Sequence, residues 1–335
     1  MKDYHIKYMP SERVLITGGA GFIGSNLAHA LVNLKAEVTI VDALLPQYGG
    51  SLLNLKEIRD KIRFIKGDFR DLGLMKKVVK DKDIVFNCAA QVSHTLSIED
   101  PFLDMDLNCR GNLTVLEALR QGNDKAKVVY AGTRGEIGKL RYKPIDENHP
   151  TDPVDMNGID KLTAEKYHLL YNDLYGIRAS SLRINNTYGI RHQMKSGDYG
   201  IVNWFIRRAM LNEPIKIFGT GEQTRDYNYS GDVTDAMLLA AQSKKADGEV
   251  FMLGSGRETK FIDVVKLIIK TVGSGSYELV PWSKERKAIE IGNFVVSYRK
   301  INKLLGWHPK TTLEEGIKKT VAWYKPRLKE YLTRF

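Results

Sequence analysis

The chain carries the sequence Thr17-Gly18-Gly19-Ala20-Gly21-Phe22-Ile23-Gly24-Ser25-Asn26-Leu27 between an apolar run and a predicted helix. The apolar run, residues 13–16, predicts a buried strand, and the helix is expected over residues 22–34. Gly18 permits a tight turn, Gly21 lets backbone approach a pyrophosphate, and Gly24 lets helix pack closely on strand. The N–H groups of Phe22 and Ile23 begin the helix and can bind phosphate oxygens. We therefore expect a dinucleotide site here, the alternative being a plain turn between strand and helix.

Bulk properties favour a soluble α/β protein. The chain has 335 residues, 43% of them hydrophobic, which suffices for one large domain or two linked ones. With Cys88 and Cys109 as the two cysteines, no disulfide framework is expected and a reducing, cytoplasmic location is favoured. No apolar run approaches the ~20 residues that span a bilayer, and residues 1–10 lack signal-peptide character. The net charge of +11 is dispersed, which indicates a solvated surface rather than a nucleic-acid or membrane partner.

The first half of the chain alternates predicted strands with predicted helices. Strands are expected at residues 37–41, 62–66, 83–88, 127–131 and 177–184, and helices at residues 52–59, 72–80, 104–121 and 158–174. This alternation predicts an α/β fold with a Rossmann-type doubly wound parallel sheet and right-handed crossovers. Functional groups should then lie at the carboxyl ends of the strands.

The pattern changes after residue 184, where loops, glycines and aromatic residues become more frequent. We expect residues 1–184 to form an NAD-binding Rossmann domain and residues 185–335 to form mainly a smaller, interleaved substrate-binding lobe. The first domain should also receive part of residues 232–256, where a predicted strand can rejoin the sheet. No H-x-x-x-H or C-x-x-C spacing occurs, so no metal site is expected. The second half is predicted to contain helices at residues 233–242, 260–272, 297–305 and 313–332 and a strand at residues 250–253.

Acidic residues at two strand ends are placed to hold the adenosine half of a cofactor. Asp42 ends the second strand, where a carboxylate can accept from both ribose hydroxyls. The residues that follow, Ala43-Leu44-Leu45, include no arginine for a 2′-phosphate, which favours NAD over NADP. Asp68 ends the third strand and is placed to accept from the adenine amino group while Phe69 covers the ring. The alternative is that Asp68 only starts a turn.

Motifs along nearly the whole chain resemble the extended short-chain dehydrogenase/reductase family, in particular its nucleotide-sugar epimerases and dehydratases. They are residues 17–24, Asp42, residues 67–68, Asn87-Cys88-Ala89-Ala90-Gln91, Thr133, Lys161-Leu162-Thr163-Ala164-Glu165, and residues 182–189, 218–227 and 304–309. The resemblance implies bound NAD, with Ala89 and Gln91 beside it, and a nucleotide-diphosphate sugar as substrate, a UDP-sugar being favoured. It also implies a homodimer formed through the helices at residues 104–121 and 158–174. Packing on the sheet explains the apolar faces of these helices equally well.

One position departs from the family's pattern. The resemblance implies a tyrosine four residues before a helical lysine, which takes the sugar hydroxyl proton, and a Ser or Thr that bonds the same hydroxyl. Lys161 and Thr133 fit the lysine and hydroxyl positions, but Asn157 occupies the tyrosine position. A neutral carboxamide is not a useful general base near neutral pH. Tyr167 is expected on another face of the helix, whereas Tyr142 lies in the preceding loop, from which it could fold inward.

Three explanations for Asn157 stay open. In the first, Asn157 positions a water or hydroxyl while Lys161 or Glu136 takes the proton. Against this, Glu136 is more simply a surface loop carboxylate. In the second, the chemistry takes place at a different carbon; in the third, redox activity is lost and the protein only binds a nucleotide sugar.

The leading hypothesis is an NAD-dependent nucleotide-sugar epimerase, with a dehydratase or other lyase second. Dehydratases that the chain resembles carry an Asp-Glu pair directly after the threonine. Here Arg134 and Gly135 stand in those places and Glu136 is one place off, which argues against a 4,6-dehydratase.

Four side chains are predicted to hold the substrate. The resemblance implies that Asn186, directly after the sixth strand, contacts the substrate diphosphate. Arg225 and Arg286 suit bidentate capture of the same group, the alternative for each being a surface arginine. His94 follows the fourth strand and faces the sugar, or is a loop histidine with a local hydrogen bond.

Overall fold

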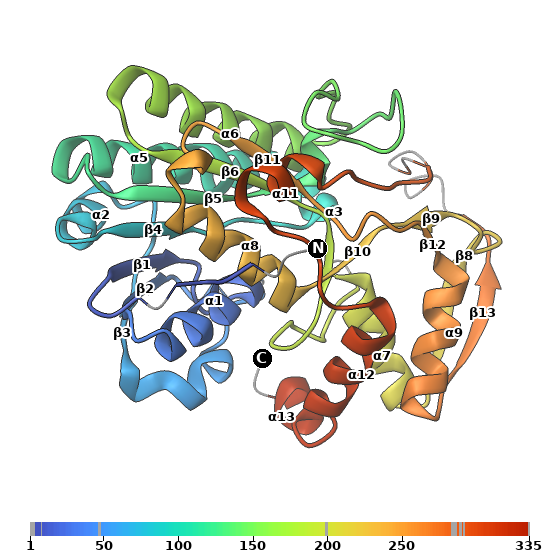
Figure 1. The fold of residues 1–335 in the computed structure, drawn as a ribbon. Coiled ribbons are helices and arrows are strands. Elements are labelled where there is room, and N and C mark those ends of the chain that lie inside the picture. The colour runs from blue at the N-terminus through green and yellow to red at the C-terminus, as the bar shows by residue number, and fades with distance from the viewer. Residues whose placement is uncertain are drawn as a thin grey trace.

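A central parallel sheet organises the chain, as Figure 1 shows. The computed structural model describes residues 4–7, 9–45, 48–197, 200–282, 287, 290 and 292–333. Seven strands pair in parallel in the order β11-β6-β5-β4-β1-β2-β3, which confirms the predicted doubly wound sheet. They are β1 (Arg13–Thr17), β2 (Glu37–Asp42), β3 (Ile62–Lys66), β4 (Ile84–Asn87), β5 (Lys127–Thr133), β6 (Ala179–Ile184) and β11 (Val250–Leu253). The strand expected at residues 250–253 thus joins the sheet beside β6.

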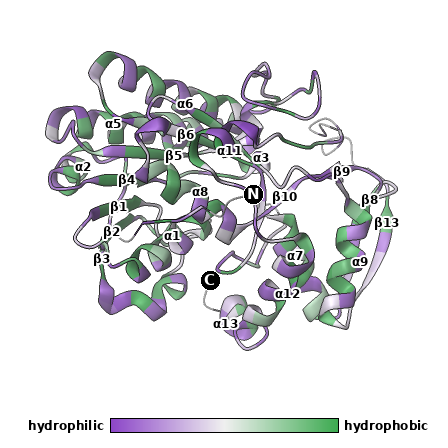
Figure 2. Cartoon of the chain, viewed as in Figure 1, coloured by the Kyte–Doolittle hydropathy of each residue, from purple (hydrophilic) through white to green (hydrophobic). Residues whose placement is uncertain are grey.

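Helices cover both faces of the sheet because its strands are apolar on both sides. Along β1, Val14 and Ile16 pack into one hydrophobic cluster and Leu15 into another, as alternation along a strand requires. Figure 2 shows the sheet strands largely in the hydrophobic colour, in keeping with burial between two helical layers. One layer contains α1 (Phe22–Asn33) and α8 (Ser230–Gln242), and the other contains α2 (Leu72–Val79), α5 (Gly111–Gly122) and α6 (Met156–Tyr175).

The C-terminal half builds a lobe with an apolar core of its own, to which Ile206, Val265 and Ile317 contribute from three helices. Figure 1 shows these helices grouped beside the sheet domain. The elements of this half other than α8 and β11 are β7 (Asn186–Tyr188), α7 (Ile201–Met210), β8 (Pro214–Phe218), β9 (Thr224–Arg225), β10 (Tyr227–Tyr229), β12 (Thr259–Lys260), α9 (Phe261–Val272), β13 (Ser276–Val280), α11 (Arg299–Leu305), α12 (Leu313–Tyr324) and α13 (Leu328–Thr333).

Two predicted helices are interrupted. The helix expected over residues 104–121 is instead α4 (Pro101–Met105), a π-helical turn (Asp106–Arg110) and α5. The helix expected over residues 313–332 ends at Tyr324 and resumes at Leu328, because Pro326 has no N–H for the preceding turn. The segment predicted as a helix over residues 52–59 is a 3₁₀ helix, Leu52–Lys61.

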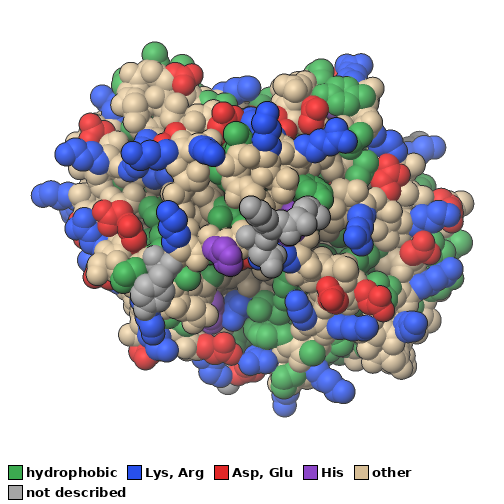
Figure 3. Space-filling view, viewed as in Figure 1, with side chains coloured by type: hydrophobic (Ala, Val, Ile, Leu, Met, Phe, Trp, Pro, Cys, Tyr) green, Lys and Arg blue, Asp and Glu red, His purple; other side chains and the backbone are tan. Residues whose placement is uncertain are grey.

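Charged side chains are scattered over the molecular surface. Figure 3 shows Lys and Arg residues interspersed with Asp and Glu across the visible face, as the dispersed charge in the sequence predicts. Within the described residues, no helix is long and apolar enough to cross a membrane, and no three His, Cys, Asp or Glu side chains gather as metal ligands would.

Candidate active site

A cavity of about 490 Å³ opens at the carboxyl ends of the sheet strands. Its wall runs from the ends of β1 to β6 to the first turn of α7, so that residues far apart in sequence meet there. Three predicted site residues do not line the cavity: Gln91 bonds Asp104, Glu136 pairs with Arg183, and Arg225 pairs with Glu290. Arg286 lies outside the described residues. The predicted residues that line the cavity are Gly18, Gly21, Phe22, Ile23, Gly24, Asp42, Asp68, Phe69, Ala89, His94, Thr133, Asn157, Lys161 and Asn186.

The glycine turn leaves no room for side chains and turns free N–H groups toward the cavity. Gly18 has a φ of +66°, and a Cβ there would lie 2.7 Å from the Cα of Ala89. A Cβ on Gly24 would lie 2.4 Å from the Gly18 carbonyl oxygen, so α1 packs directly on the turn. No side chain caps α1, and within the described chain no acceptor bonds the N–H groups of Phe22 and Ile23. An uncapped helix N-terminus of this kind fits a pyrophosphate.

The carboxylate of Asp42 is fixed on the cavity wall at the end of β2. It accepts from the N–H groups of Ala20 and Leu44, both at 2.9 Å. Burial raises its pKa, although these two hydrogen bonds act in the opposite direction. This placement fits the ribose of an adenosine and would repel a 2′-phosphate.

At the end of β3, Asp68 lines the cavity and also starts a turn; its contact with an adenine stays a prediction. Its carboxylate accepts from the Arg70 N–H at 2.9 Å and pairs with the Arg70 guanidinium at 2.6 Å. Burial alone would raise the pKa of Asp68, but the bonds from Arg70 lower it. Phe69 beside it is buried and lines the same wall.

Lys161 and Thr133 meet at the carboxyl end of β5. The Lys161 ammonium donates to the Ala131 carbonyl at 2.7 Å and lies 4.6 Å from the centre of the Tyr130 ring. Burial lowers the pKa of Lys161 to about 8. The Thr133 hydroxyl oxygen accepts from the Gly135 N–H at 3.1 Å, which leaves its hydrogen free to donate into the cavity.

Asn157 is held in a buried polar network at the cavity wall. Its Nδ2 donates to the Gln91 carbonyl at 2.9 Å and to Asp104 at 3.2 Å. The Gln91 side chain donates to the same carboxylate at 2.8 Å and bonds Ser93. Gln91, expected beside the cofactor, is therefore turned into this network and shapes the site indirectly.

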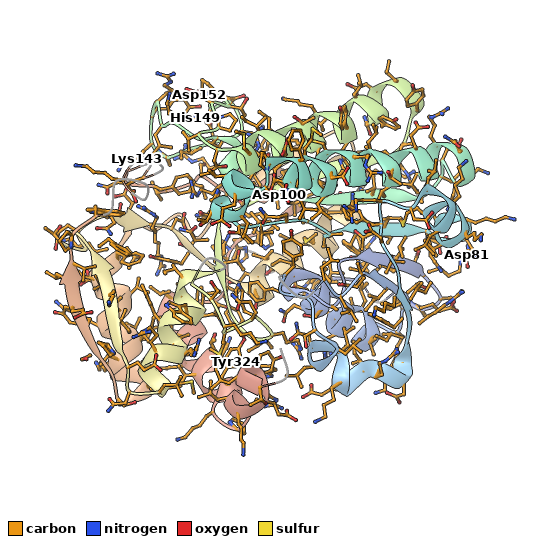
Figure 4. All side chains as sticks on the ribbon, turned by 180° about the vertical axis from the view of Figure 1, so that it is seen from behind. Asp81, Asp100, Lys143, His149, Asp152 and Tyr324 are labelled. Carbon is orange, nitrogen blue, oxygen red and sulfur yellow. The ribbon has the colours of Figure 1, made fainter. Side chains whose placement is uncertain are left out.

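Neither tyrosine weighed from the sequence reaches the cavity. Tyr142 is exposed and donates to Asp146 at 2.7 Å. It lies on the loop that Lys143, His149 and Asp152 mark at the edge of the molecule in Figure 4. Tyr167 packs against the core shared by α2, α5 and α6.

The tyrosine that lines the cavity, among the described residues, is Tyr48 from the loop after β2. Burial and the nearby carboxylates of Asp104 and Asp100 raise its pKa. A raised pKa is the opposite of what a proton-accepting tyrosinate requires. Tyr48 is therefore less suited than an ordinary tyrosine to take the proton.

The expectation that Glu136 is a surface carboxylate is wrong. Glu136 is fully buried, accepts from the Thr133 N–H at 2.8 Å and pairs with Arg183 at 3.1 Å. Arg183 also binds Glu165 at 2.6 Å, and burial together with Glu165 raises the pKa of Glu136. Because both Glu136 oxygens are engaged and neither faces the cavity, its role is to fix Thr133 rather than to take a proton from substrate.

A histidine–carboxylate pair stands at the mouth of the cavity. His94 begins α3 (His94–Glu99), lines the cavity, and places Nδ1 2.6 Å from the Asp155 carboxylate. Asp155 is the N-cap of α6 and accepts from the Gly158 N–H at 2.8 Å. Burial would raise the pKa of Asp155, but the bond from His94 lowers it. The sequence pointed to His94, but not to Asp155, which is 61 residues away.

Arg134, not Arg225, brings a cation to the cavity. The Arg134 guanidinium lies 5.0 Å from the Phe294 ring, and its buried Nε has no hydrogen-bond partner in the described part of the chain. Burial lowers its pKa to about 10. Arg225 instead binds both oxygens of Glu290, at 2.6 and 2.8 Å.

Comparison with known proteins identifies the family to which the chain belongs. The family model described as GDP-mannose 4,6 dehydratase matches residues 15–320. The chain belongs to this family of extended short-chain dehydrogenases/reductases, which includes nucleotide-sugar epimerases and dehydratases.

Individual relatives resemble the chain over nearly their full length. A Methanocaldococcus jannaschii protein, provisionally named a UDP-glucose 4-epimerase, is 38% identical over 93% of this chain and 98% of its own. The Mycolicibacterium smegmatis UDP-glucose 4-epimerase is 32% identical with the same coverages. The structure of Thermotoga maritima UDP-glucose 4-epimerase with UDP-glucose is 32% identical and superposes with a TM-score of 0.86, covering 94% of this chain and 99% of that one.

Proposed function

We propose that this chain is an NAD-dependent epimerase of a nucleotide-diphosphate sugar. The observation that carries the proposal is the meeting of Lys161 and Thr133 with the glycine turn and Asp42 around one cavity. Bound NAD would supply a reversible hydride acceptor for a sugar carbinol. In this proposal residues 1–184 hold NAD and residues 185–335 mainly hold the sugar nucleotide.

Each part of the cavity wall has a task in this reaction. The N–H groups of Phe22 and Ile23 bind the pyrophosphate of the cofactor, and Asp42 accepts from its adenosine ribose. Lys161 donates to the nicotinamide ribose and holds a positive charge beside the reacting hydroxyl. Thr133 donates a hydrogen bond to that hydroxyl and fixes its position.

An anionic substrate is supported by Arg134. Its buried Nε has no hydrogen-bond partner within the described chain, and the carboxylates of Asp155 and Glu290 offset the burial of the charge only in part, so a bound anion would stabilise it. Asn186 offers a neutral donor to the same diphosphate from the end of the sheet. Because relatives are named for UDP-glucose, we propose a UDP-sugar.

Two alternatives are less well supported. A dehydratase needs an acid beside the sugar to complete the elimination, but Arg134 and Gly135 follow Thr133, and Glu136 is engaged by Arg183. A protein that only binds the sugar nucleotide would explain Asn157, but not the positions of Lys161 and Thr133.

A homodimer is supported by exposed apolar side chains on α3, α4 and α6. Exposed apolar surface is typical of an interface, and Phe102 is 78% exposed in the single chain. The two cysteines are both free, which supports a reducing, cytoplasmic location. Light scattering coupled to gel filtration should give twice the chain mass, and a monomeric mass would contradict the dimer. The apolar side chains are Ile98, Phe102, Met105, Met156, Ile159, Leu170 and Leu174.

The decisive test is to purify the protein, measure bound NAD(H), and incubate it with UDP-, CDP- and dTDP-sugars in deuterated water. An epimer without added deuterium supports direct inversion of the carbinol, and one deuterium indicates inversion beside a transient ketone. Loss of water identifies a dehydratase. Tight binding without any product would refute the proposed enzyme.

A further inference from the structure

The proposed reaction needs a proton acceptor for the sugar hydroxyl, and Asn157 cannot serve. Lys161 directs its ammonium at the Ala131 carbonyl, and Glu136 is held by Arg183. Tyr48 has a raised pKa. We infer that His94, oriented by Asp155, exchanges the hydroxyl proton in place of the tyrosine; this inference rests on the proposed function.

The first support is where the imidazole lies. A Cβ placed on Gly135 would lie 3.5 Å from the Thr133 hydroxyl oxygen and 3.6 Å from Cε1 of His94. One methyl group would therefore touch both side chains, so the imidazole and the Thr133 hydroxyl are neighbours, and both residues line the cavity. The His94 side chain keeps 37% of its surface exposed, which leaves it accessible to a ligand.

The second support is the way in which Asp155 fixes the ring. A carboxylate only accepts, so Nδ1 carries the hydrogen of the 2.6 Å bond and Nε2 keeps its lone pair. Asp155 is 6% exposed and is itself held by the Gly158 N–H at the start of α6. This is the orienting arrangement that a histidine base needs. Within the described chain, no group bonds Nε2.

Charged groups of both signs surround this corner. Asp155 bonds the imidazole, and Arg134 and Lys161 line the same cavity from neighbouring elements. Asp104 on α4 is turned toward Gln91 and Asn157. Bound NAD would supply the hydride acceptor for the carbon that is oxidised. The part of His94 is the proton: when the O–H bond of the sugar breaks, its proton passes to Nε2, and on reduction Nε2 returns it.

The first experiment needs no substrate. Nitrogen-15 NMR of the imidazole, with the His94 signals identified by their loss in His94→Gln, shows which ring nitrogen carries the hydrogen. The expected result is Nδ1–H in the neutral wild-type ring and loss of this preference in Asp155→Ala, because the carboxylate accepts from Nδ1. An Nε2–H ring in the wild type would overturn the pairing on which the inference stands.

The second experiment uses the NAD-loaded enzyme with a sugar nucleotide that the wild type converts. His94→Gln should lower kcat at least about 100-fold with KM within threefold, and imidazole should restore part of the activity to His94→Ala. His5→Gln, an exposed histidine, is the matched control.

A His94→Gln enzyme with kcat within threefold of wild type would overturn the inference alone. Loss of activity in Tyr48→Phe but not in His94→Gln would do the same and assign the proton to the phenol. A wild type that binds NAD and sugar nucleotides without turnover would instead refute the proposed function, and the inference with it.

Discussion

Lys161→Met should make the protein more stable at pH 7 and abolish turnover. The ammonium is buried, donates to the Ala131 carbonyl and has a pKa lowered from 10.5 to about 8. Keeping its proton in the folded state at pH 7 therefore destabilises the protein by about 3 kcal/mol. Losing the hydrogen bond to Ala131 offsets ~1–2 kcal/mol of the gain. The variant should be more stable than the wild type by about 1–2 kcal/mol.

The stability of the wild type should rise with pH above pH 8. Below pH 8 the lysine is protonated in both folded and unfolded states, and the whole penalty is present. Between pH 8 and 10.5 the folded protein releases the proton while the unfolded chain keeps it, so the wild type gains stability as pH rises. The free energy of unfolding of the wild type should therefore rise relative to that of Lys161→Met by about 2 kcal/mol between pH 7 and pH 9.5.

Urea denaturation followed by circular dichroism at both pH values, without cofactor, measures this difference. Lys166→Met is the matched control, because Lys166 is exposed on the same helix. A stability difference between Lys161→Met and wild type that is the same at both pH values would refute the burial argument. Retained epimerisation by Lys161→Met would remove the residue from the mechanism.

Three further predictions concern the cofactor turn, cofactor choice and the buried network. Gly24→Ala should destabilise by about 1–3 kcal/mol and weaken NAD binding, because its Cβ meets backbone at 2.4 Å; thermal melting and NAD titration measure both. NADP should bind roughly 30-fold more weakly than NAD, because the Asp42 carboxylate repels the 2′-phosphate. In the same titration, Asp42→Ala should bring the two dissociation constants closer together. Arg183→Leu should cost about 3–5 kcal/mol in urea denaturation, because it leaves two buried carboxylates unpaired.

Each of these predictions has an outcome that would contradict it. Gly122→Ala is the control for the glycine turn, since its Cβ would meet only ordinary contacts at 3.7 Å; equal effects of the two alanines would remove the packing argument. NADP bound as tightly as NAD would show that Asp42 does not face the ribose. Wild-type stability of Arg183→Leu would mean that the glutamates are already protonated or solvated.

The sequence predicts those parts of the site that depend on local pattern. The glycine spacing predicts the turn around Gly18 and Gly24, and a carboxylate at a strand end predicts Asp42, because parallel strands bring their ends to one edge. The burial of Glu136 could not be predicted, since its partner Arg183 lies 47 residues away on the neighbouring strand. Exposure depends on such long-range partners, which no local pattern contains.

The first turn of α6 links the asparagine at position 157 to the role proposed for His94. Asn157 donates to the Gln91 carbonyl and to Asp104, two buried acceptors that also accept from Asn108 and Gln91, so a phenol turned toward the cavity would remove one hydrogen bond from each. Two residues earlier, Asp155 caps the same helix and holds His94 at the cavity mouth. The carboxamide therefore ties the wall together, and in the proposed mechanism the proton acceptor lies on α3 instead of α6. In this arrangement, installing a tyrosine at position 157 would disturb the wall without supplying a base that the site lacks.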